Sequence, residues 1–204
     1  IDTDVDGQEG EILAKGPVIM QGYYQDPEAT AAVFDKDGWF HTGDVGVIDP
    51  KSGCIKITGR LKSMIVLKSG KKVFPEEIEQ LIMRYPFIKE SMVFGDSEQD
   101  GDVTISAKFV LDPQILSREG ISEEELVTRL DQVVKEINLQ MPGFKSIRNY
   151  VYSFQELIKT TTQKVKRPSE IKRIQEALDR GKVKFRQFTG KKHRSSGFAV
   201  PNRT

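Results

Sequence analysis

The chain has 204 residues, of which 37% are hydrophobic, 30% charged and 8% aromatic, as in an ordinary globular protein long enough to bury a core. Its 31 basic residues are balanced by 30 acidic ones, and the net charge of +1 excludes a global field that would attract nucleic acid or an anionic membrane. The chain has one cysteine, Cys54, which excludes an internal disulfide framework. One cysteine and two histidines in the whole sequence also argue against a zinc site.

The beginning of the chain, IDTDVDGQEGEIL, lacks the cationic and apolar parts of a signal peptide. No apolar run approaches the ~20 residues needed to span a bilayer. We therefore expect a cytoplasmic protein, with peripheral association at the inner face of the membrane as an alternative. The chain also lacks an initiator methionine and enters a strand pattern at once, which predicts a fragment of a longer protein.

Residues 1–60 are predicted to be rich in β-structure. Glu11–Met20 carries short apolar runs, and Val45–Ile48 and Ile55–Thr58 flank the turn-rich DPKSG, a pattern typical of a hairpin. Between these segments, Asp26–Phe34 predicts a short helix, because aspartate caps a helix well and proline is favoured at its first position.

The next segments predict a hairpin and a helix. Ile65–Leu67 and Lys72–Phe74 flank a Ser-Gly-Lys turn. Pro75 then begins a helix with apolar residues at helical spacing, namely Ile78, Leu81, Ile82 and Tyr85.

Three strands and two helices are predicted in the rest of the second half. Val103–Leu111 alternates, which places Val103, Ile105, Ala107, Phe109 and Leu111 on one face of a strand, and Ile88–Phe94 can pair with it. Ser122 and Glu125 form a capping box for a helix whose apolar face holds Leu126, Leu130, Val133 and Ile137. The last strand and helix are predicted at Asn149–Phe154 and Pro168–Leu178.

These elements predict an α+β fold in two parts, with the seam at Arg60–Ser63. Residues 1–61 are the β-rich part. Residues 62–180 are predicted to form a small unit with a roughly three-stranded sheet flanked by helices. Residues 181–204 are basic and punctuated by Gly and Ser, which predicts a tail or loosely held extension.

Three motifs carry candidate functional residues, and each has an ordinary structural explanation beside the functional one. In DGWFHTGD, Asp44 either stabilises a turn or accepts hydrogen bonds from the two hydroxyls of a ribose. In GRLKSMIVLKSGKKVFPEEIE, Arg60 offers a fork of donors to phosphate or sugar oxygens, while Lys62 is otherwise an exposed linker residue. LIKTTTQKVKR is either a solvated basic loop or a mobile loop that delivers a lysine to an anionic substrate.

Together with GEILAKGPVIMQGYY, these ordered motifs closely resemble the later motifs of the adenylate-forming superfamily, which contains acyl-CoA synthetases, peptide synthetase adenylation domains and beetle luciferases. Within it, the chain is most similar to bacterial long-chain fatty acid CoA ligases, where a Lys-Thr-rich stretch is followed by KIKR-like residues. The resemblance covers residues 10–180 and implies the carboxy-terminal portion of such an enzyme, which would be inactive alone. Residues 1–61 would then be the β-rich end of the large domain, and residues 62–180 the small mobile C-terminal domain.

The resemblance implies a role for six residues. Asp44 matches the aspartate that binds the ribose of ATP, and Arg60 matches an arginine that contacts the nucleotide. Lys62 matches the hinge about which the small domain rotates between half-reactions. Ser69 and Gly70 fall on the loop that lines the pantetheine tunnel of coenzyme A, and Lys164 matches the lysine that bridges the carboxylate and the α-phosphate.

The last motif departs from the family pattern, because Gln163 stands where the consensus has glycine. This predicts a loop stiffer than usual. Of the other cations in the motif, we expect Lys159 and Lys166 to be solvated and Arg167 to contact the large domain or the nucleotide.

The implied reaction activates a long-chain acid with ATP and transfers the acyl group to coenzyme A, with Mg²⁺ held by ligands in a preceding domain. The partners are then the fatty acid, ATP, coenzyme A and the large domain of the same enzyme, without nucleic acid. Two alternatives remain: an adenylating enzyme for another acid or acceptor, and a non-catalytic interaction module whose basic segment docks on an acidic partner or membrane.

Overall fold

The computed structural model describes residue 2 and residues 9–97, 103–181, 185, 190–194 and 197–198. The chain divides into two compact units, Ile1–Met64 and Ile65–Thr204, and each is described here by itself. Among the described residues, no helix combines the length and the apolar character that a membrane crossing requires.

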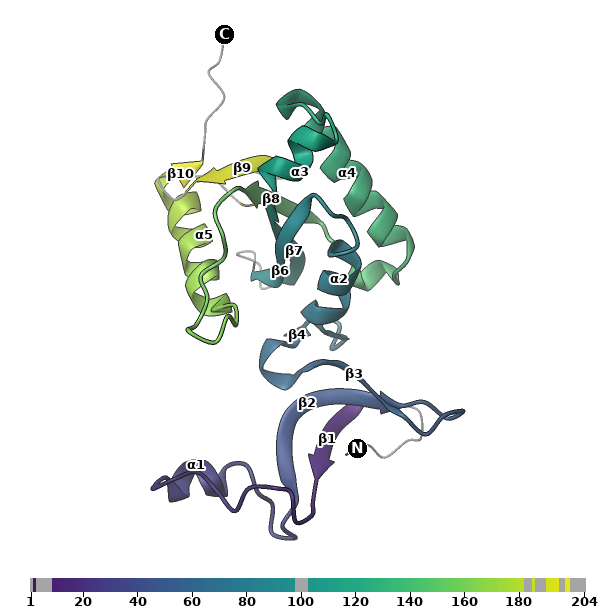
Figure 1. Cartoon of the computed structure of the whole chain (residues 1–204), viewed down its shortest axis with the longest axis vertical. Coiled ribbons are helices and arrows are strands. Elements are labelled where there is room, and N and C mark those ends of the chain that lie inside the picture. Colours follow the sequence, from purple (N-terminus) through teal and green to yellow (C-terminus); the bar gives the residue numbers. More distant parts are fainter. Residues whose placement is uncertain are drawn as a thin grey trace. The chain divides into compact units, whose positions relative to one another are not determined.

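The first unit is built on an antiparallel sheet with the order β1-β2-β3 (Figure 1). Strands β1 (Gly10–Ala14), β2 (Phe40–Ile48) and β3 (Ile55–Arg60) follow in chain order, and the 3-10 helix η1 (Leu61–Ser63) comes directly after β3. The predicted hairpin is confirmed, since Ile48 at the end of β2 pairs with Ile55 at the start of β3.

The predicted short helix is present as α1 (Pro27–Ala31), and Asp26 caps it by accepting a hydrogen bond from Ala29 N at 2.9 Å. It ends earlier than predicted. The chain turns instead to bring Phe34 into a β-bridge with Phe40, and the two rings lie 5.4 Å apart. The long-range contact therefore overrides the helical pattern of the last residues.

The second unit contains a five-stranded sheet with the order β10-β9-β8-β7-β6. Strand β6 (Ile88–Ser97) runs antiparallel to β7 (Val103–Leu111), as predicted, and β8 (Asn149–Ser153) runs parallel to β7. A separate small hairpin joins β4 (Ile65–Val66) to β5 (Lys72–Val73), also as predicted. The mixed α+β fold class is thereby confirmed.

Helices cover both faces of this sheet (Figure 1). Helices α2 (Pro75–Ile82) and α4 (Glu123–Leu139) pack on one face, and the short helix α3 (Pro113–Arg118) precedes α4. Helix α5 (Arg167–Gly181) packs on the other face. The predicted capping box at Ser122 and Glu125 is present, with both reciprocal hydrogen bonds formed.

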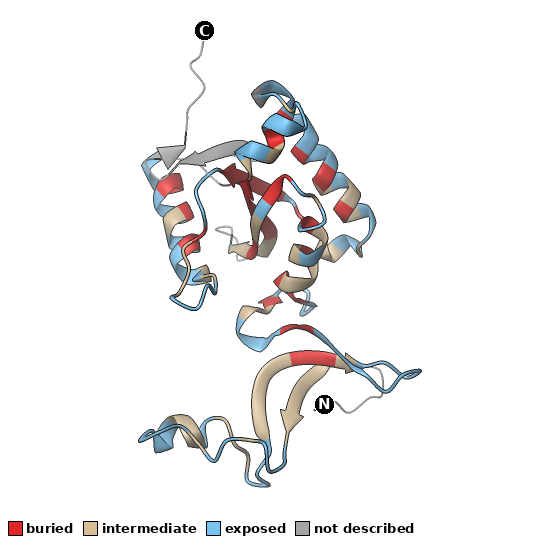
Figure 2. Cartoon of the chain, viewed as in Figure 1, coloured by how far each residue is buried: buried red, intermediate tan, exposed pale blue. Residues whose placement is uncertain are grey.

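Each sheet face has its own hydrophobic core (Figure 2). On the α2/α4 face, Ile105, Ala107, Phe109 and Leu111 of β7 are buried and Val103 is partly buried, together with the four apolar residues predicted on α4. The core on the α5 face contains Met92, Phe94, Val110, Val151, Leu157, Ile174, Leu178 and Phe185. The sheet is therefore the central layer of a three-layer unit.

The sheet is wider than predicted, because the segment predicted to be a loosely held tail supplies two strands. Strand β9 (Lys191–Arg194) pairs parallel with β8, and β10 (Gly197–Phe198) pairs antiparallel with β9. Backbone pairing does not require an apolar pattern, so the Lys-Arg-rich sequence of β9 gives no strand signal. Phe185 is 3% exposed and stacks edge-on against Phe94, while Lys182, Lys184 and Arg186 lie outside the described residues.

A buried ion pair joins the sheet to α5. Lys108 Nζ of β7 lies 3.1 Å from Glu170 Oε2 of α5, and both side chains are fully buried. Arg173 lies 2.5 Å from the other oxygen of Glu170. Burial lowers the pKa of Lys108 to about 8, so at neutral pH the amine still carries its proton and the pair is charged.

We expect Glu170→Ala to destabilise the chain by about 3–5 kcal/mol, because it leaves the buried ammonium of Lys108 without its counter-charge. Denaturant unfolding followed by circular dichroism measures this loss. Glu176→Ala is the matched control, since Glu176 is on the same helix but pairs with Lys172 at 4.0 Å in solvent, and we expect a change below about 0.5 kcal/mol. Equal losses in the two variants would contradict the role of the buried pair.

Candidate functional site

In the first unit, Asp44 and Arg60 face each other across the sheet. They are register partners on β2 and β3, and Arg60 Nε lies 2.9 Å from Asp44 Oδ1. The carboxylate is half-buried at 26% exposure, whereas the guanidinium side chain is 59% exposed. A carboxylate has about four acceptor positions, so Asp44 retains acceptors for further donors beside this ion pair.

The loop before Asp44 is fixed to the neighbouring strand. Thr42 Oγ1 donates to Ile12 O at 2.7 Å and accepts from Asp44 N at 3.1 Å. Gly43 has φ +72°, a left-handed conformation that suits glycine, and its N–H donates to Glu11 Oε1 at 3.0 Å. These bonds fix the backbone of Thr42, Gly43 and Asp44 to β1 at an irregularity in the pairing of β1 with β2.

Glu11 and His41 belong to this site, although sequence reasoning did not single them out. The second oxygen of Glu11 lies 2.8 Å from His41 Nδ1, and this hydrogen bond raises the pKa of His41. Glu11 thus joins the histidine and the amide of Gly43 through its two oxygens. The sequence offered one indication of this contact: Glu11 lies near the start of a strand that pairs antiparallel with the strand containing HTGD.

In the second unit, Ser69 and Gly70 lie on the exposed turn between β4 and β5. Gly70 N donates to Leu67 O at 2.8 Å, and Leu67 N donates to Lys71 O at 2.9 Å. Gly70 has φ +77°. This is the pattern of a hairpin with a three-residue loop that ends on a left-handed residue.

The Lys164 loop repeats the same pattern. Gln163 N donates to Thr160 O at 3.0 Å, and Thr160 N donates to Lys164 O at 2.8 Å. Gln163 occupies the left-handed position, with φ +62°. The glycine of the family pattern thus has a physical reason here, and Gln163 adopts that glycine-like conformation at a cost of about 1–2 kcal/mol.

Lys164 is exposed on this hairpin, and among the described residues no side-chain partner of its ammonium is present. Its backbone N–H donates to Thr160 Oγ1 at 3.1 Å, which fixes the main chain but not the amine. Lys166 is also exposed.

The prediction that Lys159 is solvated is wrong, and Arg167 has a partner within the second unit that the sequence did not indicate. Lys159 is not solvated, because its ammonium pairs with Glu90 of β6 and its side chain is only 22% exposed. Arg167 directs its fork at Glu79 of α2, with two bonds of 2.8 Å, and donates to Val93 O at 2.9 Å. Both partners lie far away in the sequence, so charge pattern alone could not assign them.

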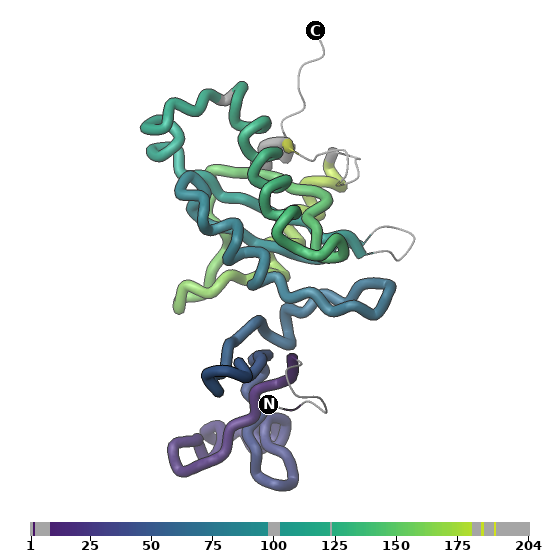
Figure 3. The backbone as a smooth tube through the Cα atoms, turned by 90° about the vertical axis from the view of Figure 1, so that its right-hand side faces the viewer, coloured from purple at the N-terminus to yellow at the C-terminus, as the bar shows by residue number. Residues whose placement is uncertain are grey.

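The predicted residues form two groups. Asp44, Arg60 and the exposed Lys62 of η1 lie in the first unit, with the first two in contact. Ser69, Gly70 and Lys164 lie in the second unit. Its β4–β5 hairpin and the loop before α5 project from separate sides, as the views of Figures 1 and 3 show.

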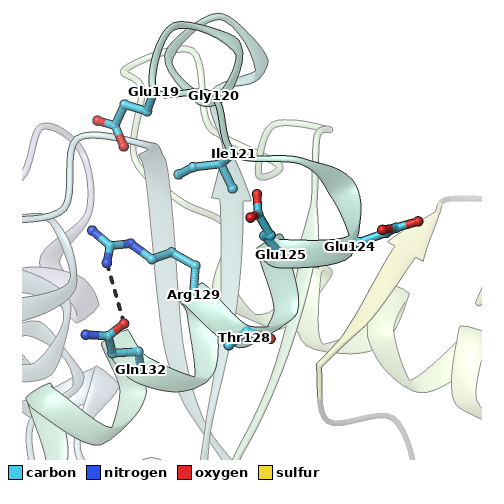
Figure 4. Close-up of a pocket in the computed structure, with 8 residues that line it drawn as sticks. All are labelled: Glu119, Gly120, Ile121, Glu124, Glu125, Thr128, Arg129 and Gln132. Atoms are coloured by element: carbon cyan, nitrogen blue, oxygen red, sulfur yellow. Dashed lines mark hydrogen bonds between the residues drawn. The ribbon is translucent and has the colours of Figure 1, made fainter.

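A hollow on the second unit does not coincide with these residues. It has a volume of about 570 Å³ and lies at the start of α4, where Arg129 approaches Gln132 at 3.5 Å (Figure 4). Its lining includes Glu119, Ile121, Glu124 and Glu125. Within the described part of the chain, no group of three or more His, Cys, Asp or Glu side chains is arranged to hold a metal ion.

Comparisons with known proteins agree on one family. Residues 62–180 match the model of the AMP-binding enzyme C-terminal domain. The chain is 31% identical over 191 residues to long chain acyl-CoA synthetase 7, peroxisomal, of Arabidopsis thaliana. This match covers 84% of this chain and 27% of that protein. It is also 45% identical over 91 residues to a Mycobacterium tuberculosis CoA ligase named for a propanoyl group on a fused-ring indenyl system. That match covers 45% of this chain and 18% of that protein.

A solved structure gives the same result. ATP-bound MatB from Rhodopseudomonas palustris has a TM-score of 0.63 and 32% identity to this chain, and the match covers 81% of this chain and 30% of that protein. The chain thus spans about a quarter or less of the length of the curated relatives named above.

The repeated hairpin geometry predicts opposite effects of substitution at its two left-handed positions. We expect Gly70→Ala to destabilise the chain by about 1 kcal/mol, because a Cβ there meets no neighbour and only the positive φ is penalised. We expect Gln163→Gly to stabilise it by about 0.5 kcal/mol, because glycine removes the strain of the positive φ but loses more backbone entropy on folding, which offsets part of that gain. Denaturant unfolding measures both, and Gly143→Ala, at an open position without positive φ, is the control. A Gly70→Ala effect no larger than that of the control would contradict the assignment.

Proposed function

Because the chain belongs to the family of AMP-binding enzyme C-terminal domains, we propose that it is part of a ligase that activates a carboxylic acid with ATP and passes the acyl group to coenzyme A. In the first half-reaction, a carboxylate oxygen attacks the α-phosphorus of ATP, pyrophosphate leaves and an acyl-adenylate forms. In the second, the thiol of coenzyme A attacks the acyl carbon and AMP leaves.

Lys164 is the residue to which we assign the first half-reaction. Two anions, the carboxylate and the triphosphate, must approach each other, and a positioned ammonium offsets their repulsion as negative charge develops. The observation that carries the proposal is that Lys164 is exposed, has no side-chain partner among the described residues and lies on a hairpin whose two stems are anchored. An anchored hairpin with a free ammonium is suited to deliver charge to a substrate.

Asp44 and Arg60 are assigned to the nucleotide. The backbone of Asp44 is held in place by the Thr-Gly turn, and its carboxylate retains acceptors for the two hydroxyls of a ribose, as the resemblance implies. The exposed fork of Arg60 can donate to phosphate or sugar oxygens while its Nε stays on Asp44. The ion pair therefore supports a preorganised site for ATP.

The second half-reaction is assigned to Ser69 and Gly70, on the loop that would line the pantetheine tunnel. This hairpin and the Lys164 hairpin lie on separate sides of the second unit, so one rotation of the unit can present either of them to a substrate. We assign that rotation to Lys62, in the short 3-10 helix between the two units, because a hinge needs only a few residues at the end of an element.

A partner surface on the first unit supports a preceding large domain. Val18 and Tyr24 are about nine-tenths exposed, at 91% and 90%, and Ile57 is 59% exposed. Val18 and Tyr24 lie on the segment between β1 and α1, and Ile57 lies on β3. Exposed large apolar residues on so small a unit are typical of a surface that another part of the protein covers. We assign them to the remainder of the large domain, which would also hold the acid pocket and the Mg²⁺ ligands.

The acid is proposed to be a long-chain fatty acid, on the motif resemblance and on the name of the Arabidopsis relative. The mycobacterial relative is named for a fused-ring acid, so another acid or acceptor is the alternative. A purely non-catalytic interaction module is less well supported, because the described part of the basic segment is built into the sheet. Peripheral contact with a membrane is compatible with either acid.

Lys164→Ala in the enzyme that contains this chain should lower acid-dependent ATP–pyrophosphate exchange by about 10²- to 10³-fold, the typical loss of one positioned transition-state contact. Thioester formation from supplied acyl-adenylate should stay within about threefold, because the lysine withdraws before that step. Lys166→Ala, two residues away and also exposed, is the matched control and should leave both half-reactions unchanged. Equal loss of both half-reactions in Lys164→Ala would refute the assigned role.

The acid is tested by pyrophosphate exchange with unmodified enzyme across short-, medium- and long-chain fatty acids, amino acids and a fused-ring propanoic acid. We expect kcat/KM to rise with chain length, because each buried methylene adds about 0.8 kcal/mol of apolar transfer free energy. Reactions without acid give the background. A preference for an amino acid or the ring acid would favour the alternative and leave the adenylating chemistry in place.

A further inference from the structure

The stem that leads into the Lys164 hairpin is held by two carboxylates from different elements. Glu90 of β6 accepts the backbone N–H of Leu157 at 2.9 Å through Oε2. Glu170 of α5 accepts the next backbone N–H, that of Ile158, at 2.9 Å through Oε1. Consecutive amides thus donate to side chains from the sheet and from the helix, so this stem cannot shift without breaking a charge-assisted hydrogen bond.

Glu90 also holds the stem through a side chain. Its Oε1 pairs with the ammonium of Lys159, the residue that forms a β-bridge with Val165 across the hairpin. The carboxylate is 13% exposed, so these contacts are largely removed from solvent. One carboxylate therefore fixes the backbone at Leu157 and the side chain at Lys159, five residues before Lys164.

The returning stem is anchored separately. Lys166 N donates to Ile158 O at 2.7 Å, and Arg167 is clamped to Glu79 by two bonds of 2.8 Å. Burial disfavours the charged guanidinium, but the hydrogen bonds that Arg167 donates to Glu79 and the charges of Glu79 and Glu76 outweigh it and raise the pKa of Arg167. The backbone of Lys164 is therefore held between two fixed stems, and only its side chain is free to move toward a substrate.

Building on the function proposed above, we infer that Glu90 is a positioning residue for Lys164. It does not touch a substrate; it sets where the ammonium lies by fixing the stem. Glu170 has the same geometry but is fully buried against Lys108, so its removal would also cost the stability of the unit. A Glu90 variant can separate the position of Lys164 from the stability of the unit. When Glu90 is removed, the ammonium of Lys159 loses its partner but lies at a partly exposed site, where water can solvate it.

The test uses the complete enzyme with Glu90→Ala, Glu90→Gln, Lys164→Ala and the double variant Glu90→Ala/Lys164→Ala. Glu90→Ala should lower kcat of pyrophosphate exchange by about 10- to 100-fold, since displacement of a reacting group by about 1 Å costs this much. KM for ATP and thioester formation from supplied acyl-adenylate should change less than about twofold. Glu90→Gln keeps an oxygen for Leu157 N and should retain most of the activity.

The double variant distinguishes positioning from a general structural effect. If Glu90 acts through Lys164, its removal has no further effect once Lys164 is gone, so the double variant should match Lys164→Ala alone. The matched control is Glu176→Gln, an exposed carboxylate of α5 that pairs with Lys172 at 4.0 Å, and it should leave the rates unchanged.

The inference is overturned if Glu90→Ala leaves pyrophosphate exchange intact, if it slows both half-reactions equally, or if its effect multiplies with that of Lys164→Ala. If Glu90→Ala does not fold, the conservative Glu90→Gln variant takes its place, and a full loss of exchange in that folded variant also overturns the inference. A Lys164→Ala enzyme with normal exchange would instead refute the proposed function, so the two failures are distinguishable.

Discussion

The second unit depends on Glu170, a carboxylate with no exposure to solvent. One of its oxygens is paired with the ammonium of Lys108 in the middle of the sheet, and the other accepts the amide of Ile158 at the base of the Lys164 hairpin. A charge in this position is tolerated only because it is paired and hydrogen-bonded. The same carboxylate therefore decides where α5 packs and where the hairpin begins, so the core and the candidate catalytic loop are set by one group.

The two loops assigned to the two half-reactions have the same construction. Each is a three-residue hairpin loop that ends on a left-handed residue, Gly70 in one and Gln163 in the other. Such loops keep a tight backbone while leaving the side chains at the tip exposed. They differ in their anchoring: Lys71 Nζ lies 4.5 Å from the ring centre of Phe144 beside the first loop, whereas carboxylates hold both stems of the second. This second arrangement suits a residue that must place a charge accurately.

The first unit applies the same principle to a carboxylate instead of an ammonium. Asp44 is placed by strand register opposite Arg60, and the turn before it is fixed to β1 through Thr42 and Gly43. Neither residue needs to move to present hydrogen-bonding groups to a nucleotide. Preorganised groups of this kind contribute to binding and catalysis because little reorganisation is left to occur with the substrate.

The sequence by itself determined the local structure and most of the candidate site. Helix caps, the alternation of β7, both short hairpins and the order of the motifs depend on neighbouring residues, so Asp44, Arg60, Lys62, Ser69, Gly70 and Lys164 could all be named from the chain alone. The tertiary structure decided which charges are paired. Lys159 resembles a solvated cation in the sequence, but Glu90, remote in the chain, pairs with it, and Glu79 likewise pairs with Arg167. It also decided that a basic segment becomes strand β9, because backbone hydrogen bonding to β8 is independent of side-chain pattern.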